Sequence, residues 1–182
     1  CQNNCLASEY APLAADCGSN VADFGAALFG APADAANVWI GAAHSVTSVH
    51  QDWYENLYAV VAGTKVFTLT PPWESTRLRK RPYFSAKYAL ASAEESGAAT
   101  WAAEVDWAED AKTPWIECDP ALPPDDAANG CAADELAGAT RLTAAVGPGD
   151  VLYLPATWFH RVGQVGDSTE GKVVAVNYWF DM

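Results

Sequence analysis

The sequence predicts a mainly β fold, in which short antiparallel strands form a double-stranded barrel or jelly roll around a mid-chain insertion. Short apolar or alternating runs bounded by turn residues occur in both halves of the chain, and the stretch between them has a different composition. At 182 residues, of which 51% are hydrophobic, the chain is long enough for the core of one domain. We therefore expect a single domain over residues 1–182.

Residues 1–72 are expected to form an N-terminal flank followed by the first half of the barrel. The flank, residues 1–35, is rich in alanine and glycine and allows two short helices, at 9–17 and 21–29. The barrel core begins at residue 36, with strands predicted at 37–41, 46–50, 56–62 and 65–69. Gly63 and Thr64 form the turn of a hairpin, and Pro71 and Pro72 end the last strand.

Residues 73–140 are predicted to be a loop-rich insertion with short helical pieces, because Ala, Gly and Pro are frequent there. The insertion begins with a basic cluster, Arg77, Arg79, Lys80 and Arg81, which is either a docking site or a solvated loop. Residues 91–135 then hold twelve of the 23 acidic residues. A long excursion of this kind is typical of a lid or of a surface for a partner.

Regular structure is expected again over residues 141–182, the second half of the barrel core. The predicted strands are 142–146, 151–154, 159–165 and 173–180, with a tight turn at 147–150 and a break at Pro155. Because the chain begins with Cys and not Met, we expect it to be a fragment that lacks its true beginning.

Charge and cysteine content limit the classes of partner. The formal net charge of -13 opposes binding to a nucleic-acid backbone and suits a cationic protein partner, or simply a solvated acidic surface. Five cysteines without a C-x-x-C pair indicate free thiols in a reducing compartment and not a disulfide framework or zinc finger. No secretory signal or membrane-spanning run is visible, so a cytoplasmic protein, with nuclear location as a further option, is expected.

Three residues suggest a metal site. His50 and Asp52 lie two positions apart, the spacing at which strand side chains share a face, and His160 opens a later strand. Two histidines and one carboxylate cover one face of an octahedral metal and leave positions open, which suits non-haem Fe(II). Zinc and manganese are the alternatives. His44 has no carboxylate at strand spacing and is left out.

Lys65 is the candidate for binding an organic anion. It begins the strand after the glycine turn, and a lysine that enters a barrel is costly unless it meets an anion. A dicarboxylate could bind the metal at one end and Lys65 at the other. The alternative is that Lys65 points to solvent.

Several long motifs resemble the JmjC (cupin-like) family of 2-oxoglutarate oxygenases. They are TSVHQDWYENLYAVVAGTKVFTLTPP, TPWIECDP, GDVLYLPATWFHRV and AVNYWFDM. The resemblance implies a double-stranded β-helix with iron ligands His50, Asp52 and His160, and with Lys65 on the distal carboxylate of 2-oxoglutarate. It also implies that the co-substrate site is lined by Thr47, Asn56, Asn177 and Trp179. Thr47 is three residues before His50, so a bulge or bend is needed to turn both inward.

The same resemblance implies an Fe(II)- and 2-oxoglutarate-dependent protein hydroxylase acting on lysyl side chains, for example of a translation-associated GTPase. The family usually has an N-terminal extension and a C-terminal dimerising segment, so the resemblance implies that this fragment is truncated at both ends and forms a homodimer only where the C-terminal segment is present. The alternatives are a demethylase or peptidase acting on basic tails, a cupin-like binding module without turnover, and a tRNA-modifying enzyme, which the charge opposes. In the family a tyrosine before the barrel also binds the co-substrate, and no clear counterpart precedes Asn37.

Overall fold

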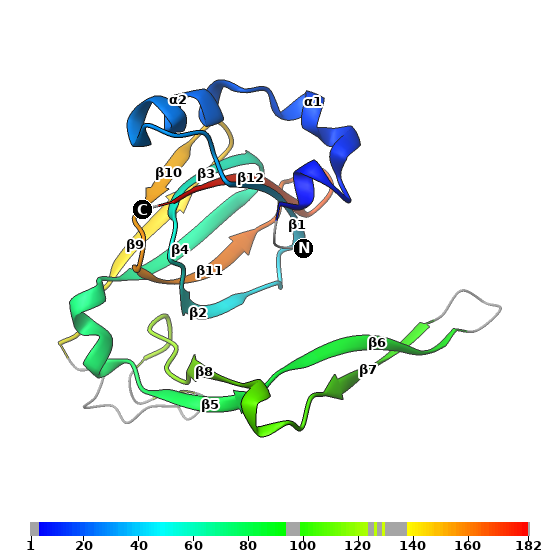
Figure 1. Ribbon diagram of the computed structural model, residues 1–182, viewed down its shortest axis with the longest axis vertical. Coiled ribbons are helices and arrows are strands. Elements are labelled where there is room, and N and C mark those ends of the chain that lie inside the picture. The colour runs from blue at the N-terminus through cyan, green and yellow to red at the C-terminus, as the bar shows by residue number, and fades with distance from the viewer. Residues whose placement is uncertain (1–3, 94–98, 124–125, 127–128, 130–137, 182) are drawn as a thin grey trace.

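The computed structural model describes residues 4–93, 99–123, 126, 129 and 138–181. Two four-stranded antiparallel sheets form a jelly-roll barrel, with helices on one side and the insertion on the other (Figure 1). The mainly β fold class is therefore confirmed.

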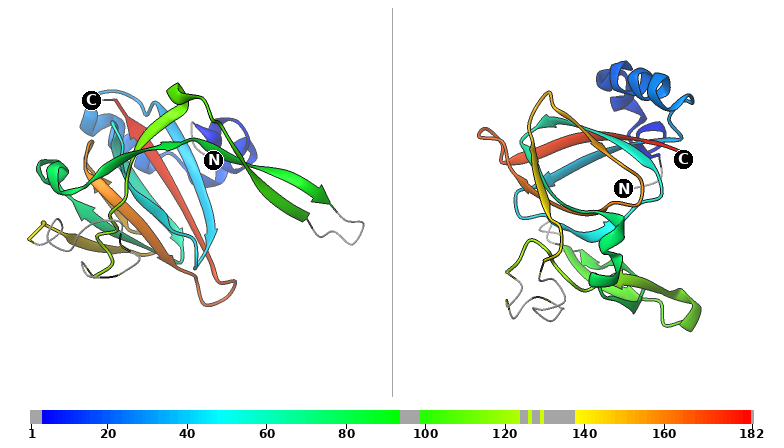
Figure 2. Two further views of the ribbon diagram at one scale, coloured as in Figure 1. Left: turned by 90° about the horizontal axis from the view of Figure 1, so that it is seen from below. Right: turned by 90° about the vertical axis from the view of Figure 1, so that its left-hand side faces the viewer.

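All eight predicted barrel strands are present, and their pairing is that of a double-stranded β-helix. One sheet has the order β1-β12-β3-β10 and the other β2-β11-β4-β9, so strands from the two ends of the chain alternate in each sheet. The right-hand view in Figure 2 looks into the barrel. The strand bounds are β1 Ala35–Ala42, β2 Thr47–Gln51, β3 Glu55–Ala62, β4 Thr64–Thr70, β9 Leu142–Val146, β10 Val151–Leu154, β11 Phe159–Val165 and β12 Lys172–Phe180.

The alternation of side chains along the strands divides the core in two. Tyr58 and Val60 of β3 point between the sheets and pack with Phe67 of β4, whereas Leu57 faces the N-terminal flank. The flank consists of η1 (Cys5–Ala7), η2 (Ala11–Leu13), α1 (Ala14–Cys17) and α2 (Asn20–Phe29). The predicted helix 21–29 is confirmed as α2, whereas 9–17 divides into a 3-10 turn and one α-helical turn.

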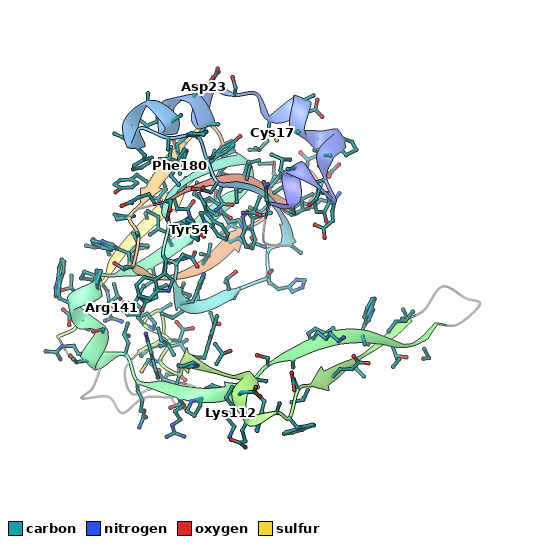
Figure 3. All side chains as sticks on the ribbon, viewed as in Figure 1. Cys17, Asp23, Tyr54, Lys112, Arg141 and Phe180 are labelled. Carbon is teal, nitrogen blue, oxygen red and sulfur yellow. The ribbon has the colours of Figure 1, made fainter. Side chains whose placement is uncertain are left out.

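Helix α2 lies close against the outer face of the first sheet (Figure 3). A Cβ atom on Gly25 would lie only 2.1 Å from Cζ of Phe180 and 2.9 Å from Cδ1 of Leu57, so glycine is what permits this approach. The ring of Phe29 packs on the ring of Phe180, with 4.9 Å between their centroids. The flank thus seals the outer face of the sheet and leaves the barrel interior free.

The insertion contains more β structure than the sequence indicated, so the expectation of a loop-rich segment is wrong for its described residues. β5 (Lys80–Phe84) pairs with β8 (Lys112–Ile116), and β6 (Ala86–Ala93) pairs with β7 (Ala99–Val105) in a hairpin that projects from the barrel (Figure 1). Two 3-10 helices, η3 (Pro72–Arg77) and η4 (Glu109–Ala111), flank these strands. Alanine dominates β6 and β7, and its low β propensity hid both strands from a pattern-based prediction.

The arginines of the basic cluster are paired with carboxylates of the insertion itself. The Nε atoms of Arg79 and Arg81 lie 3.3 Å and 2.8 Å from Oε2 of Glu117, and Arg77 pairs with Glu74 at 2.9 Å. These ion pairs favour a structural role over a docking site for the three arginines. Lys80 is different, because its Nζ donates a hydrogen bond to Oε1 of Gln51 at 3.0 Å.

Cysteine chemistry differs from the expectation. Cys118 is disulfide-bonded, which corrects the prediction of free thiols throughout, whereas Cys17 is a free thiol. Cys1 and Cys131 lie outside the described residues. No described helix has the length and apolar character needed to cross a bilayer.

Candidate metal centre

The two predicted histidine ligands meet because their strands are neighbours. His50 of β2 is directly opposite His160 of β11 in the antiparallel register, and their ring centroids are 4.1 Å apart. Asp52 follows β2, and its Oδ2 lies 3.8 Å from Nε2 of His50 and 3.6 Å from Nε2 of His160. The three ligand atoms, one from each residue, all lie within 4.8 Å of one another. The predicted triad is therefore assembled.

Backbone carbonyls fix how both imidazole rings are protonated. Nδ1 of His50 donates a hydrogen bond to the carbonyl of Ser48 at 2.9 Å, and Nδ1 of His160 donates to the carbonyl of Trp158 at 3.0 Å. A carbonyl oxygen can only accept, so both rings carry their proton on Nδ1. The lone pair of each Nε2 is then free to bind a metal, and these outer hydrogen bonds hold the rings in place.

The spacing and electrostatics of the triad fit a divalent metal. With bond lengths of roughly 2.1 Å, adjacent ligands of one ion lie about 3 to 3.5 Å apart, close to the distances observed here. These distances are too long for direct hydrogen bonds. Burial, followed by the nearby His50, lowers the pKa of His160 to about 4, so its ring is neutral, the form that binds metal.

The turn before β11 is fastened to the residue that supplies the carboxylate. The backbone N–H of Thr157 donates to the carbonyl of Asp52 at 2.7 Å. Thr157 has a φ of 66°, an uncommon value for a β-branched residue. Strained backbone of this kind persists only where the surroundings enforce it and is often found at functional sites. Here it joins Asp52 to the chain segment that presents His160.

The bulge predicted from Thr47 is present in β2. His50 pairs with His160, but Thr47 pairs with Val162, so β2 has one more residue than β11 over this interval. The extra residue reverses the alternation, and Thr47 lines the same pocket as His50.

One pocket joins the metal triad to Lys65. Gln164, the partner of Lys65 across the sheet, is four residues along β11 from His160, roughly 13 Å at the usual rise per residue. The lining includes all eight site residues predicted from the sequence: Thr47, His50, Asp52, Asn56, Lys65, His160, Asn177 and Trp179. The barrel therefore brings the predicted set together around one pocket in its interior.

Lys65 is buried inside the barrel, so the alternative of a solvent-facing lysine is excluded. Its side chain is only 7% exposed, and its Nζ donates a hydrogen bond to Oε1 of Gln164 at 2.6 Å. Burial lowers the pKa of Lys65 to about 8, with no described carboxylate offsetting the effect. A buried ammonium group without a counter-charge is what a bound anion would stabilise.

Side-chain hydrogen bonds connect several polar groups of the pocket wall, and one buried donor there has no partner among the described residues. Nδ2 of Asn177 donates to Oδ1 of Asn56 at 3.1 Å, and Nε1 of Trp39 donates to Oδ1 of Asn177 at 2.9 Å. Nε1 of Trp179 is buried and has no hydrogen-bond partner among the described residues. The ring of Trp179 stacks on Tyr54 at 5.6 Å between centroids. The pocket therefore offers one unused donor to a ligand.

Trp115 of the insertion is part of the metal surroundings, although the sequence assigned it no role. Its Nε1 donates to Oγ of Ser48 at 3.0 Å, and its ring lies nearly parallel to that of His50, with 6.0 Å between centroids and 7° between planes. Only the motif TPWIECDP pointed to this segment. A contact across 67 positions of sequence cannot be found from spacing.

Comparison with known proteins gives a family match over the whole chain. The family model described as a cupin-like domain matches residues 1–182. The human "Bifunctional peptidase and (3S)-lysyl hydroxylase JMJD7" is 41% identical over 182 residues, which are 100% of this chain and 52% of that protein. "Lysine-specific demethylase JMJ32" of Arabidopsis thaliana is 40% identical and "JmjC domain-containing protein E" of Dictyostelium discoideum 39%; the alignments span 100% of this chain and 51% and 52% of those proteins. The chain thus spans about half the length of the curated relatives it matches.

Proposed function

The chain belongs to the cupin-like JmjC family, whose members use Fe(II) and 2-oxoglutarate, and from this premise we propose that it hydroxylates lysyl side chains of a protein substrate. One observation carries the proposal: a single pocket holds a metal-binding triad together with a buried lysine that pairs with no carboxylate of the described residues. The net reaction would convert a C–H bond, dioxygen and 2-oxoglutarate into an alcohol, succinate and CO2.

The triad would hold the metal on one face and leave the remaining positions for ligands. His50, Asp52 and His160 supply two neutral nitrogens and one carboxylate, a combination suited to Fe(II). Bound iron would supply the activation of dioxygen, while the protein positions the reactants and excludes water. Because both Nδ1–H groups are held by backbone carbonyls, neither ring can turn away without breaking a hydrogen bond.

Lys65 would anchor the distal carboxylate of the co-substrate. The side chain of Lys65 lines the pocket, its Nζ donates a hydrogen bond to Gln164, and a bound carboxylate would replace the solvation lost on burial. Thr47, Asn56, Asn177 and Trp179 are proposed to complete this subsite, with the unpartnered Nε1 of Trp179 as a donor to the ligand.

The choice of lysyl hydroxylation rests on the relatives and on charge. The human relative is named as a lysyl hydroxylase and peptidase, and the Arabidopsis relative as a lysine-specific demethylase, so lysine is common to both names. The net charge of -13 suits a cationic protein, such as a translation-associated GTPase, encountered in the cytoplasm or nucleus. Demethylation is the second candidate because of the Arabidopsis name.

The first test is an anaerobic titration of the chain with Fe(II) and 2-oxoglutarate. The visible metal-to-ligand charge-transfer band of the complex is the readout. We expect a band in the wild type, no band in His50→Ala, and a band in Lys65→Ala that needs a much higher co-substrate concentration. Absence of the band in wild-type protein that retains iron would reject the proposed site.

Product mass separates the two candidate reactions. Gain of one oxygen atom by an unmethylated lysine peptide indicates hydroxylation, and loss of one methylene group from a methylated peptide indicates demethylation. Cleavage without 2-oxoglutarate indicates a peptidase, and cleavage combined with no oxygen gain or methylene loss when Fe(II), dioxygen and 2-oxoglutarate are present would refute the oxygenase proposal.

A further inference from the structure

A second hollow adjoins the metal centre between β2 of the barrel and β8 of the insertion. This groove is lined by residues 49–51 and Trp53 on the barrel side, residues 113–116 on the insertion side, and Lys80 of β5. His50 lines both the groove and the co-substrate pocket. A molecule in the groove would therefore lie beside the metal ligands.

Both sides of the groove are strand edges. β2 is the outer strand of its sheet, and β8 pairs with β5 alone among the described strands. β2 and β8 contact each other through side chains, namely the hydrogen bond from Trp115 to Ser48, the stacking of Trp115 on His50 and the packing of Val49 with Ile116, and the described residues form no backbone ladder between them. Pro114 deprives β8 of one backbone N–H, so β2 is the better edge for an added strand. An unpaired edge next to a hollow is suited to an extended polypeptide.

The groove is apolar at its base and aromatic at its walls. Val49 and Ile116 are buried beneath it in the same cluster. Trp53 is 64% exposed and Trp115 39% exposed, while the ring of Trp115 is fixed by Ser48 and by its stacking on His50. Large, rigid aromatic side chains of this kind supply much of the binding energy at protein interfaces. The walls fit an aliphatic or aromatic side chain.

The groove carries one positive charge. Nζ of Lys80 donates to Oε1 of Gln51 at 3.0 Å and lies 5.4 Å from the centre of the Phe159 ring. Its sequence neighbours Arg79 and Arg81 are neutralised by Glu117, but no described carboxylate forms an ion pair with Lys80. A basic side chain entering the groove would be repelled, whereas an apolar or acidic one would not.

We propose that this groove binds the substrate polypeptide as an extended strand along β2 and selects an apolar, not a basic, residue next to the target lysine. The inference rests on the proposed function and deepens it. Two different charges then act on the substrate polypeptide. The acidic protein as a whole attracts cationic substrates over long distances, while Lys80 excludes a basic neighbour at short range.

The test measures peptide binding and not turnover. Nine-residue peptides with a central lysine, and with Leu, Glu or Arg scanned through the flanking positions, are titrated into the full chain with Mn(II) and 2-oxoglutarate. We expect one flanking position at which Leu binds about tenfold more tightly than Arg. Trp53→Ala should remove most of this advantage, and Lys80→Glu should reverse the preference between Glu and Arg at that position.

Two exposed residues of the projecting hairpin provide matched controls. Trp101 is 62% exposed, an exposed fraction similar to the 64% of Trp53. Lys87→Glu changes the net charge by the same amount as Lys80→Glu. Trp101→Ala and Lys87→Glu should leave the preferences unchanged. Each of three outcomes would refute the inference: all peptides bind equally, no peptide binds the wild type, or the control variants change binding as much as the groove variants do. The charge-transfer band of the iron complex is independent of all these results, so either proposal can fail alone.

Discussion

Replacing Lys65 by methionine should stabilise the protein without ligand while weakening binding of 2-oxoglutarate. Methionine keeps an unbranched apolar chain of similar length in the buried position and removes the charge. The pKa of Lys65 falls from 10.5 to about 8 on folding, and each pKa step corresponds to about 1.4 kcal/mol. The buried charge therefore costs the folded state about 3 kcal/mol at neutral pH.

The loss of one hydrogen bond reduces the gain in stability that Lys65→Met brings. Nζ of Lys65 donates to Oε1 of Gln164, and leaving that acceptor without a donor costs about 1 kcal/mol. We therefore expect Lys65→Met to raise the free energy of unfolding by about 2 kcal/mol at pH 7. Lys87→Met, an exposed lysine of the hairpin, should change the stability by less than about 0.5 kcal/mol.

The stability difference should depend on pH in a defined direction. Because the folded-state pKa of Lys65 lies below the unfolded-state value, the cost is fully present below about pH 8. It disappears as the pH rises toward 10.5, where the unfolded chain also loses the proton. Urea unfolding of wild type and Lys65→Met at pH 7 and pH 10 measures this change.

Ligand should reverse the order of stability. At about 100 times its dissociation constant, 2-oxoglutarate added with Mn(II) should stabilise the wild type by about 2.7 kcal/mol and should have little effect on Lys65→Met. A variant that is less stable than wild type at pH 7, or a difference that does not shrink at pH 10, would refute the idea that Lys65 is a destabilising charge kept for an anion.

Two further predictions concern the barrel that surrounds the site. Gly63→Ala should lower the free energy of unfolding by roughly 2 to 4 kcal/mol, because Gly63 has a φ of +70° and a new Cβ would lie 2.7 Å from the carbonyl oxygen of Lys172. Gly147→Ala, whose nearest contact would be 3.6 Å away, is the control in the same urea assay. Asn177→Leu should lower the free energy of unfolding by roughly 2 to 3 kcal/mol, because the groups on Trp39 and Asn56 that bond to Asn177 lose their partner. The same variant should weaken 2-oxoglutarate binding in calorimetry. Unchanged stability would show that water replaces both hydrogen bonds.

The barrel strands were predictable because each carries its own local pattern of alternating or apolar residues between turn signals. The bulge in β2 was also predictable, since Thr47 and His50 can face one pocket only if the alternation is reversed between them. The strands of the insertion were not predictable in this way. β6 and β7 are alanine-rich, β5 and β8 each contain a proline, and cross-strand pairing decides the structure of all four.

The sequence by itself determined the chemistry of the site. Histidine, aspartate and lysine are the residue types that bind a metal and an anion, and the two-residue spacing of His50 and Asp52 at the end of β2 places two ligands together. Only the tertiary structure decided the rest. It set His160 opposite His50, buried Lys65 in the same pocket, and brought Trp115 and Lys80 of the insertion beside β2. The reason is physical: residue types determine which groups can react, but long-range strand pairing and packing determine which groups meet.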